Sequence, residues 1–401
     1  MKDESKRTVS PQRTPLQILY MGAVYWDFIR QRPQQLALQL ARHHRVLYVS
    51  QQSPLSFMLR RQFVPPPHRV VGDNLTVLHP RIPSLAPPLQ RYGPMRAVNH
   101  RLVRRAIDTH LRNGRVDVLW LSSPWDYGYH HLIQSSLICY DCMDNQPAML
   151  PSSNIGAIEE ALFRAVDLVF ASSTGLLRRA ESFAPRALLV ANGVDFDHFV
   201  RAATDLLPAP VDLLEIPRPR IGFYGTIGFW VDLDLITSVA QRRRQWSFVL
   251  IGPRFVAASD VNRLQSLPNV HYLGLKDYAE LPAYLQHVDL WWSPFRAGEL
   301  TQDIDPVKIY EQLAAGATVL ATRSPETEKF LPLIQVASGT DEFLATIDAA
   351  LHHRDNQEQV SARLRFARLN TWEQRAATIM DGMETTLESR RHHDAGRCTA
   401  G

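Results

Sequence analysis

The chain has 401 residues, of which 45% are hydrophobic and 21% charged, and its formal net charge is +4. This composition indicates a globular protein with two domains, because the length exceeds what one compact core usually serves. The three cysteines provide no paired framework, which excludes a disulfide-rich module and indicates a reducing cytosol. No uncharged apolar run reaches about 18 residues, so the sequence predicts no membrane-spanning helix.

The two ends of the chain lack hydrophobic periodicity. Residues 1–15 are charged and contain no apolar stretch, so we expect a disordered leader and not a secretory signal. Residues 390–401 are expected to form a disordered tail. We interpret the His-His pair just before position 394 as solvated.

In the first half of the chain, short apolar runs alternate with amphipathic stretches, a pattern typical of a parallel sheet flanked by helices. The predicted strands are 16–21, 45–50, 116–121, 137–141, 167–171 and 187–191. The predicted helices are 32–43, 94–112, 153–165 and 174–183. We therefore predict a Rossmann-like, doubly wound α/β domain over residues 16–205.

The second half repeats this pattern after a proline-rich connection at 206–220, which we interpret as a linker. The predicted strands are 220–225, 247–252, 269–274, 288–293 and 317–322, and the predicted helices are 232–243, 277–287, 306–315 and 341–353. A second Rossmann-like domain is expected over 206–370. A last helix, 371–389 with Thr371 as N-cap, is expected to pack back toward the first domain.

An arginine-rich helix is predicted near 94–112, where apolar residues alternate with Arg96, Arg101, Arg104 and Arg105. Such a helix favours an anionic membrane surface as a partner, and a solvated helix face is the alternative. Nucleic-acid binding is disfavoured because no recognised nucleic-acid module accompanies the basic stretch.

The sequence CYDC, from Cys139 to Cys142, has the spacing of a metal or redox pair. It has no second pair, and Cys139 lies in an apolar run, so we interpret both residues as buried, inert thiols. The histidines likewise show no metal-ligand spacing. The sequence therefore predicts no metal site.

Ligands of parallel sheets bind beyond the carboxyl ends of the strands. Trp26, Asp27 and Arg32 follow the first predicted strand, and Asp141 and Asp144 follow the fourth. Tryptophan stacks on sugar faces and aspartate accepts hydrogen bonds from hydroxyls, so these residues are candidates for a sugar-binding site. The alternative is that they are core aromatics and caps of the following segments.

The segment DPVKIYEQLAAG (305–316) predicts a helix that begins at Asp305 and Pro306 and ends at Gly316. Lys308 and Glu311 are three residues apart and therefore share one face. A lysine in the first turn is unfavourable for the helix itself but suits an anion bound at the helix N-terminus. The alternative is an ordinary surface ion pair.

The surroundings of this helix resemble the GT-B glycosyltransferases, particularly the retaining family 4 type (group 1) of bacterial polysaccharide biosynthesis. That family has an acidic residue, seven further residues and a Glu before an LAxGxPVV segment, which corresponds here to Asp303 and Glu311 in DIDPVKIYEQLAAGATVLA. Other matching segments are RQRPQQLALQLARHHRVLYVS (30–50), NGVDFDHF (192–199), IGFYGTI (221–227) and VHYLGLKDYAELPAYLQHVDLWWSPF (270–295). The resemblance covers about residues 16–385.

The resemblance implies a GT-B fold and transfer of a hexose-type sugar from a nucleotide diphosphate to a hydroxyl of a glycan or lipid-linked saccharide. It implies retention of configuration and no cofactor. We expect a cytoplasmic enzyme, and contact of the arginine-rich helix with anionic lipid would make it peripheral on the inner face of the membrane. The expected catalytic residues are Asp303, Lys308 and Glu311, with Glu311 on the ribose. The expected donor contacts are Gly225, Thr226, Ile227, Arg254, Pro294, Lys308 and Glu311, and the expected acceptor contacts are Trp26, Asp27, Arg32, Asp141 and Asp144.

The chain departs from the family pattern at two places. Asp303 stands where the family usually has Glu, and GTIGFWVD lacks the Arg and Lys that bind phosphate in many members. Lys308 and Arg254 would then have to supply the positive charge.

Other functions on the same fold are a nucleotide-sugar epimerase or hydrolase, and a non-catalytic nucleotide-sugar-binding scaffold at the membrane. A nicotinamide enzyme is disfavoured because the Gly-x-Gly-x-x-Gly fingerprint is missing. The sequence identifies neither the sugar, the base, the acceptor, the linkage nor the oligomeric state.

Overall fold

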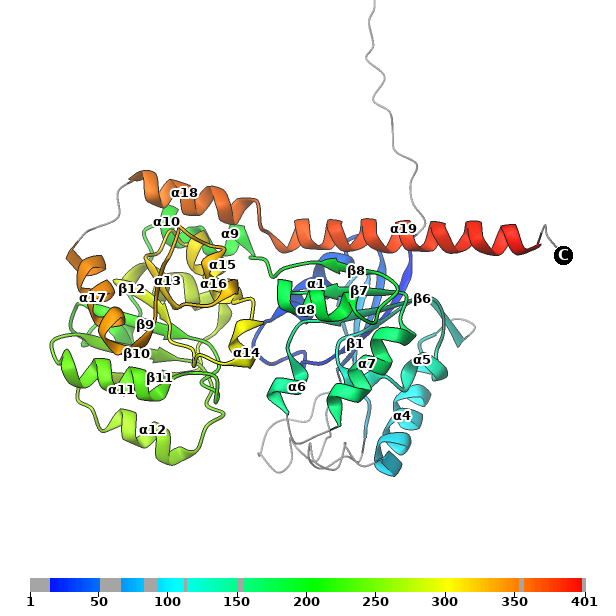
Figure 1. Ribbon diagram of the computed structural model, residues 1–401, viewed down its shortest axis with the longest axis horizontal. Helices are drawn as coiled ribbons and strands as arrows, with labels where there is room; N and C mark the ends of the chain where they lie inside the picture. Colours follow the sequence, from blue (N-terminus) through cyan, green and yellow to red (C-terminus); the bar gives the residue numbers. More distant parts are fainter. Residues whose placement is uncertain are drawn as a thin grey trace, which may run out of the picture.

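The computed structural model describes residues 15–50, 66–82, 93–111, 114–150, 154–352 and 357–398. It shows two α/β domains side by side, called here the N-domain and the C-domain, with the last helix lying along the N-domain (Figure 1). Of the disordered leader expected at 1–15, residues 1–14 lie outside the described residues.

The described part of the N-domain has an eight-stranded sheet in the order β3-β4-β2-β1-β5-β6-β7-β8. Its strands are β1 (Gln17–Gly22), β2 (Arg45–Ser50), β3 (His68–Gly72), β4 (Leu75–Leu78), β5 (Arg115–Leu121), β6 (Gln134–Cys142), β7 (Leu168–Ala171) and β8 (Ala187–Leu189). All neighbours pair in parallel except β3, which is antiparallel to β4. The central strands are buried along almost their whole length, as expected for a sheet covered by helices on both faces.

The helices of the N-domain cover both faces of this sheet. They are α1 (Arg32–Leu40), α4 (Gly93–Asp108), α5 (Tyr129–Leu132), α6 (Gln146–Met149), α7 (Ile155–Ala165) and α8 (Thr174–Glu181). Two short helices, α9 (Phe196–Phe199) and α10 (Arg201–Thr204), lead into the C-domain.

The C-domain has a parallel six-stranded sheet in its described residues, in the order β11-β10-β9-β12-β13-β14. Its strands are β9 (Arg220–Tyr224), β10 (Ser247–Ile251), β11 (Val270–Gly274), β12 (Leu290–Ser293), β13 (Val319–Thr322) and β14 (Gln335–Ala337). Its helices are α11 (Leu233–Arg242), α12 (Ala258–Gln265), α13 (Leu281–His287), α14 (Glu299–Gln302), α15 (Val307–Ala314), α16 (Pro325–Glu328), α17 (Gly339–His352) and α18 (Gln357–Arg368).

The proline-rich segment before β9 is packed against the C-domain. Leu213 and Ile216 are buried in one core cluster with Tyr224 and Trp291. The prolines therefore shape a connection that belongs to the C-domain core.

Helix α19 (Trp372–Cys398) continues past residue 389, where we expected a disordered tail to begin. Its buried residues Trp372, Ile379 and Met383 share a cluster with the strands of the N-domain. Arg390 forms an ion pair with Asp167 at 2.7 Å. The apolar side of the helix and this ion pair hold the last element of the chain against the first domain.

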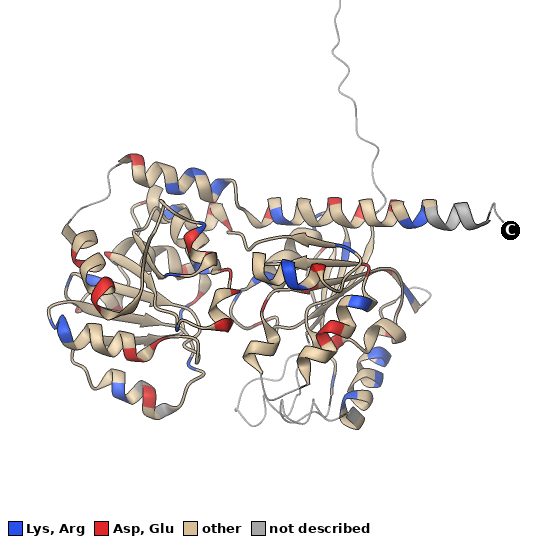
Figure 2. Ribbon diagram, in the orientation of Figure 1, with Lys and Arg blue, Asp and Glu red and all other residues tan. Residues whose placement is uncertain are grey.

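The arginine-rich helix α4 begins at Gly93 and ends at Asp108, four residues before the predicted end. Its residues Val103 and Ile107 are buried in the N-domain core, with Leu102 packed against them. Basic positions follow one another along α4 (Figure 2), and Arg101 and Arg105 are exposed. Contact with an anionic membrane through this helix stays a prediction, and it would rest mainly on charge.

Candidate active site

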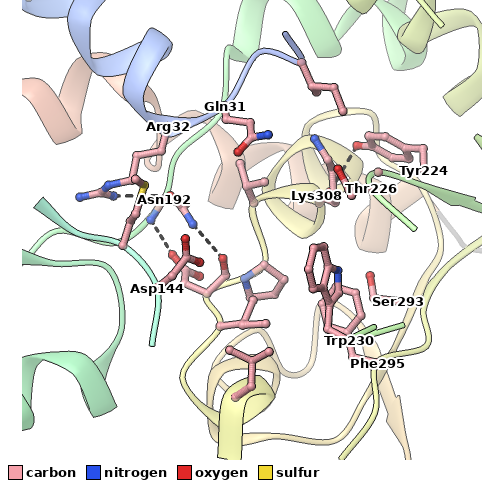
Figure 3. Close-up of a pocket in the computed structure, with 18 of the residues that line it drawn as sticks. Gln31, Arg32, Asp144, Asn192, Tyr224, Thr226, Trp230, Ser293, Phe295 and Lys308 are labelled. Carbon is pink, nitrogen blue, oxygen red and sulfur yellow. Dashed lines mark hydrogen bonds between the residues drawn. The ribbon is translucent and has the colours of Figure 1, made fainter. Parts of the chain in front are cut away.

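A cavity of about 310 Å³, called here the inner cavity, lies between the two domains at the carboxyl ends of both sheets (Figure 3). The N-domain lines it with the segment before α1 and the segment after β6. The C-domain lines it with the segments after β9 and β12 and with the start of α15. Loops that follow neighbouring parallel strands converge at this edge, which is why such sheets bind ligands there.

Lys308 in the first turn of α15 lines the inner cavity. Its Nζ lies 3.2 Å from Oε2 of Glu311 and 5.2 Å from the ring centre of Tyr224. The Tyr224 hydroxyl donates to the same carboxylate oxygen at 2.8 Å. Burial and the charge of Glu311 raise the pKa of Tyr224 well above its ordinary value, so the phenol keeps its proton. Glu311 is only 2% exposed and lies behind Lys308 and Tyr224.

The start of α15 differs from the prediction at its cap. The N-cap is Pro306, and no side chain caps the helix. Pro306, Val307 and Lys308 all line the inner cavity, so the first turn faces it. The positive end of the helix dipole and the Lys308 ammonium therefore act in the same direction, toward an anion in the cavity.

The segment after β9 contributes Gly225 and Thr226 to the cavity wall. Gly225 has φ of 136°, and its N–H donates to the Ile251 carbonyl at 2.9 Å. A Cβ at Gly252 would lie 2.0 Å from the Gly225 carbonyl oxygen, so the two loops can approach this closely only without a side chain there. The Gly225 N–H is thus used within the fold, and Ile227 is buried with its N–H bonded to Pro253.

Besides Ile227 and Glu311, two further expected donor contacts do not line the inner cavity. Arg254 lies over the ring of Tyr272, 4.8 Å from its centre. The Pro294 carbonyl accepts a hydrogen bond from the Asp232 N–H at 2.8 Å. We expected Arg254 to supply an additional positive charge for phosphate binding, but its guanidinium is not directed at the cavity.

Arg32 and Asp141 form a buried ion pair in the N-domain, with exposures of 4% and 0%. The Arg32 Nε and Nη2 donate to Asp141 Oδ1 at 2.9 and 2.7 Å, and Nη1 donates to the Val190 carbonyl at 2.8 Å. Arg32 borders the inner cavity, but these bonds occupy its donors. The pair ties the end of β6 to the segment after β8, and an acceptor contact by Arg32 or Asp141 stays a prediction.

Asp144, two residues beyond β6, lines the inner cavity on the N-domain side (Figure 3). Burial and the charge of Asp141 raise the pKa of Asp144 to about 6. Its carboxyl group therefore changes charge close to neutral pH, a property often found in groups that take part in catalysis.

Trp26 and Asp27, the other expected acceptor contacts, lie outside the inner cavity. Trp26 packs edge-on against Tyr48, with ring centres 4.9 Å apart. Asp27 is exposed and pairs with Arg69 at 2.6 Å. Trp26 is packed against the core, as in the alternative interpretation, whereas Asp27 forms an ion pair and an acceptor contact by either residue stays a prediction.

Asp303, expected to contact the transferred sugar, faces the N-domain. Its Oδ2 accepts a hydrogen bond from the Asn145 side chain at 2.8 Å. A Cβ on Gly175 would lie 1.8 Å from Asp303 Oδ1, so the carboxylate rests against the first turn of α8. Burial raises the pKa of Asp303.

Two further carboxylates of the C-domain bind backbone N–H groups of the N-domain. Asp305 accepts from the Asn192 N–H at 2.5 Å, and Glu326 accepts from the Thr174 N–H at 2.9 Å and from its hydroxyl at 2.6 Å. Lys329 lies between them, 2.8 Å from Asp305 and 2.6 Å from Glu326. Together with Asp303, these acidic groups hold the domains in a closed arrangement around the inner cavity.

Sequence reasoning did not single out four residues that line the inner cavity, namely Asn192, Trp230, Ser293 and Phe295. Ser293 is the last residue of β12, and the other three lie in the segments that follow β8, β9 and β12. Ligands of parallel sheets bind at such strand ends, so these segments could have been singled out. Trp230 and Phe295 form an aromatic wall on the C-domain side (Figure 3). The Cβ that Gly228 lacks would lie 2.5 Å from the Trp230 ring, which explains the glycine at that position.

Within the part of the chain that the structure describes, no group of three or more His, Cys, Asp or Glu side chains is placed to hold a metal ion. Likewise, none of the described helices is both long and apolar enough to cross a membrane. Cys139 and Cys142 are fully buried, and burial raises the pKa of both thiols. Neither thiol is therefore reactive in this fold.

Two Rossmann-like domains that face each other across a cleft are the architecture of the GT-B fold of glycosyltransferases. Residues 234–381 match the family model described as Glycosyl transferase-like. A protein named as a teichuronic acid biosynthesis glycosyltransferase (TuaH) of Bacillus subtilis is 25% identical over 280 residues, which are 65% of this chain and 70% of TuaH.

Solved structures agree with this fold. Sucrose-phosphate synthase of Thermosynechococcus elongatus superposes with a TM-score of 0.72 at 13% identity, over 94% of this chain and 100% of the other. Anabaena HepE in complex with UDP-glucose superposes with a TM-score of 0.62 at 14% identity, over 93% and 100%. The predicted α/β fold is confirmed, and the chain is a glycosyltransferase of the GT-B type.

Proposed function

We propose that this glycosyltransferase transfers a sugar from a nucleoside diphosphate to a hydroxyl of a glycan or lipid-linked saccharide, with retention of configuration. The observation that carries the proposal is the position of Lys308, which projects from the first turn of α15 into a cavity between the domains. The likeness to HepE, whose structure contains UDP-glucose, makes a uridine diphosphate sugar the first donor to test. The likeness to TuaH, which is named for teichuronic acid biosynthesis, supports a role in assembling a polysaccharide. A position at the inner face of the membrane is a further part of this proposal.

The difficult step is departure of the diphosphate from the sugar carbon, which leaves an oxocarbenium-like sugar and adds negative charge to the phosphate. Lys308 and the N–H groups at the start of α15 would stabilise that charge, with Thr226 beside them. Fixed positive groups of this kind contribute about 10²- to 10³-fold to the rate. No metal ion is required for this role.

Glu311 holds Lys308 in place. Its carboxylate contacts both the Lys308 ammonium and the Tyr224 hydroxyl, and all three groups belong to the C-domain side of the inner cavity. Since Glu311 is 2% exposed, its main role in this arrangement is to position Lys308. The ribose contact expected from the family resemblance remains a proposal that needs a nucleotide to reach past Lys308.

The sugar would lie between Asp144 on the N-domain side and the aromatic wall of Trp230 and Phe295 on the other. The apolar face of a sugar ring packs on an aromatic ring, and its hydroxyls are suited to donate to the Asp144 carboxylate. With retention, the departing phosphate accepts the proton of the acceptor hydroxyl, so Asp144 acts by hydrogen bonding and charge.

A thermal-shift screen with nucleoside diphosphates and their sugars tests the donor. A ligand that binds only the native state stabilises it, by about 2.7 kcal/mol at a hundredfold excess over Kd. The melting temperature therefore rises. We expect a shift with a uridine diphosphate sugar, followed by release of the diphosphate that depends on an added saccharide acceptor. Release that needs no acceptor would favour a hydrolase, and turnover to an isomeric donor would favour an epimerase. The absence of any shift would contradict the proposal.

A further inference from the structure

A second cavity of about 540 Å³, called here the outer chamber, adjoins the inner cavity. Trp230 and Leu300 line both, so these two side chains stand between the chambers. One wall of the outer chamber belongs to α6 of the N-domain, with Pro147 and Ala148. The opposite wall belongs to the C-domain segments 229–230 and 296–301.

Two aromatic side chains, Phe229 and Trp230, line the outer chamber, and backbone contacts fix the segment that carries them. The Arg296 N–H donates to the Trp230 carbonyl at 2.8 Å, and Val231 and Phe295 form an isolated antiparallel bridge. Phe229 packs edge-on against Trp230 with ring centres 5.2 Å apart, yet it stays 52% exposed. A fixed aromatic side chain that is half exposed beside a cavity offers its free face to a ligand.

The rim of the outer chamber is polar and of mixed charge. Arg296 lies 3.5 Å from Asp234, and Glu299 is exposed at the start of α14. Aromatic faces combined with a guanidinium and a carboxylate match the chemistry of a pyranose, which has apolar C–H faces and hydroxyls that donate and accept. The chamber volume is within the range of about 300–1,000 Å³ that is usual for small-molecule sites.

We propose that the outer chamber binds the second sugar of the acceptor, counted from the hydroxyl that is glycosylated. This inference rests on the proposed function, because the acceptor hydroxyl must enter the inner cavity next to Trp230. The rest of a glycan then leaves through the adjoining chamber and stacks on Phe229. Because α6 supplies one wall, the subsite is complete only when the domains are closed. The enzyme therefore prefers acceptors of two or more sugars over a monosaccharide.

The test compares acceptors of increasing length in the presence of UDP. Two series serve as probes, methyl β-glucoside with cellobiose and cellotriose, and methyl N-acetylglucosaminide with its β-linked di- and trisaccharides. Binding is followed by indole fluorescence and by saturation-transfer NMR. We expect affinity to rise about two- to tenfold from one sugar to two in at least one series, the scale of one added aromatic contact.

Phe229→Ala should remove this gain while leaving the thermal shift with the donor unchanged. Phe255→Ala is the matched control, because Phe255 is 54% exposed and lines a neighbouring hollow together with Phe229, but lies outside the outer chamber. Ala148→Trp fills the chamber from the N-domain side and should block the disaccharide but not the monosaccharide. Equal effects of Phe229→Ala and Phe255→Ala, or no gain with length in either series, would overturn the subsite. A normal donor shift in the same variants would leave the proposed function standing.

Discussion

Lys308 Nζ lies 3.2 Å from Glu311 Oε2, yet only Lys308 lines the inner cavity, whereas Glu311 is 2% exposed. The two residues are one helical turn apart on α15, so the buried carboxylate stands directly behind the ammonium. Holding a lysine by a buried carboxylate reduces the motion of its long side chain before a ligand binds. The pair therefore acts as one unit, in which Lys308 faces the ligand and Glu311 positions Lys308.

Lys308→Ala is expected to reduce kcat by about 10²-fold or more, because it removes a fixed positive charge from the departing diphosphate. The measurement is steady-state release of the nucleoside diphosphate with a saturating acceptor. Lys276→Ala is a matched control, since Lys276 makes an equivalent arrangement outside the cavity, 2.6 Å from Asp212 and 5.8 Å from the Tyr284 ring. Near-normal turnover in Lys308→Ala would exclude this lysine from the mechanism.

Glu311→Gln keeps the hydrogen bond from Tyr224 and removes the charge that holds Lys308. We expect the Kd for the nucleoside diphosphate to rise about tenfold, the usual scale for a hydrogen bond to a charged group. Calorimetry with the diphosphate and with the free nucleoside separates two roles. Weaker binding of the diphosphate alone supports positioning of Lys308, whereas equal weakening of the nucleoside supports direct contact with the ribose. An unchanged Kd for both would rule out either role.

The fold was predictable where strands are buried on both faces. The predicted strand 45–50 coincides with β2. A strand that is buried on both faces reads as a continuous apolar run, which the sequence shows directly. Strand β4 was not predicted, although Leu75, Val77 and Leu78 are buried, because it has only four residues. The edge strands β3 and β14 were not predicted either. All five residues of β3 are exposed, and β14 has three residues, so neither leaves an apolar pattern. Their pairing depends on neighbouring strands that the local sequence does not specify.

The site was predictable at the level of segments but not of side-chain direction. Lys308 and Asp144 line the inner cavity as expected, since each follows a strand end or begins a helix there. Asp303 and Arg254 stand in equally suggestive segments but face Asn145 and Tyr272. Which way a loop residue points depends on the partner that tertiary packing brings near it, and here that partner is often in the other domain.

Asp144 should make activity depend on pH near neutrality. Since its pKa is raised to about 6, the carboxylate form is lost as pH falls through that value. We expect kcat/KM to rise with pH through about 6, and Asp144→Asn to lower it about tenfold or more and to flatten the profile. A wild-type profile that is flat from pH 5 to 8, or an unchanged Asp144→Asn enzyme, would contradict a role for this carboxylate.

The same shift has a consequence for stability that can be measured without substrate. The pKa of Asp144 is raised from 3.8 to about 6, so between these values the folded chain keeps a proton that the unfolded chain releases. Stability from this group is therefore present at low pH and lost as pH rises through about 6. Asp144→Asn should melt at a higher temperature than wild type at pH 7.5 and no higher at pH 4. A lower melting temperature at pH 7.5 would contradict this assignment.

Asp303 should act through domain closure, because its carboxylate accepts from Asn145 of the other domain at 2.8 Å and does not line the inner cavity. Removing one of several interdomain contacts weakens closure without removing a group from the reacting atoms. We therefore expect Asp303→Ala and Asn145→Ala each to raise KM for the donor by about tenfold or less, with little change in kcat. The double variant should be no worse than either single variant, since both remove the same bond. A loss of 10²-fold or more in kcat for Asp303→Ala, with a near-normal Asn145→Ala enzyme, would instead show that Asp303 contacts the sugar.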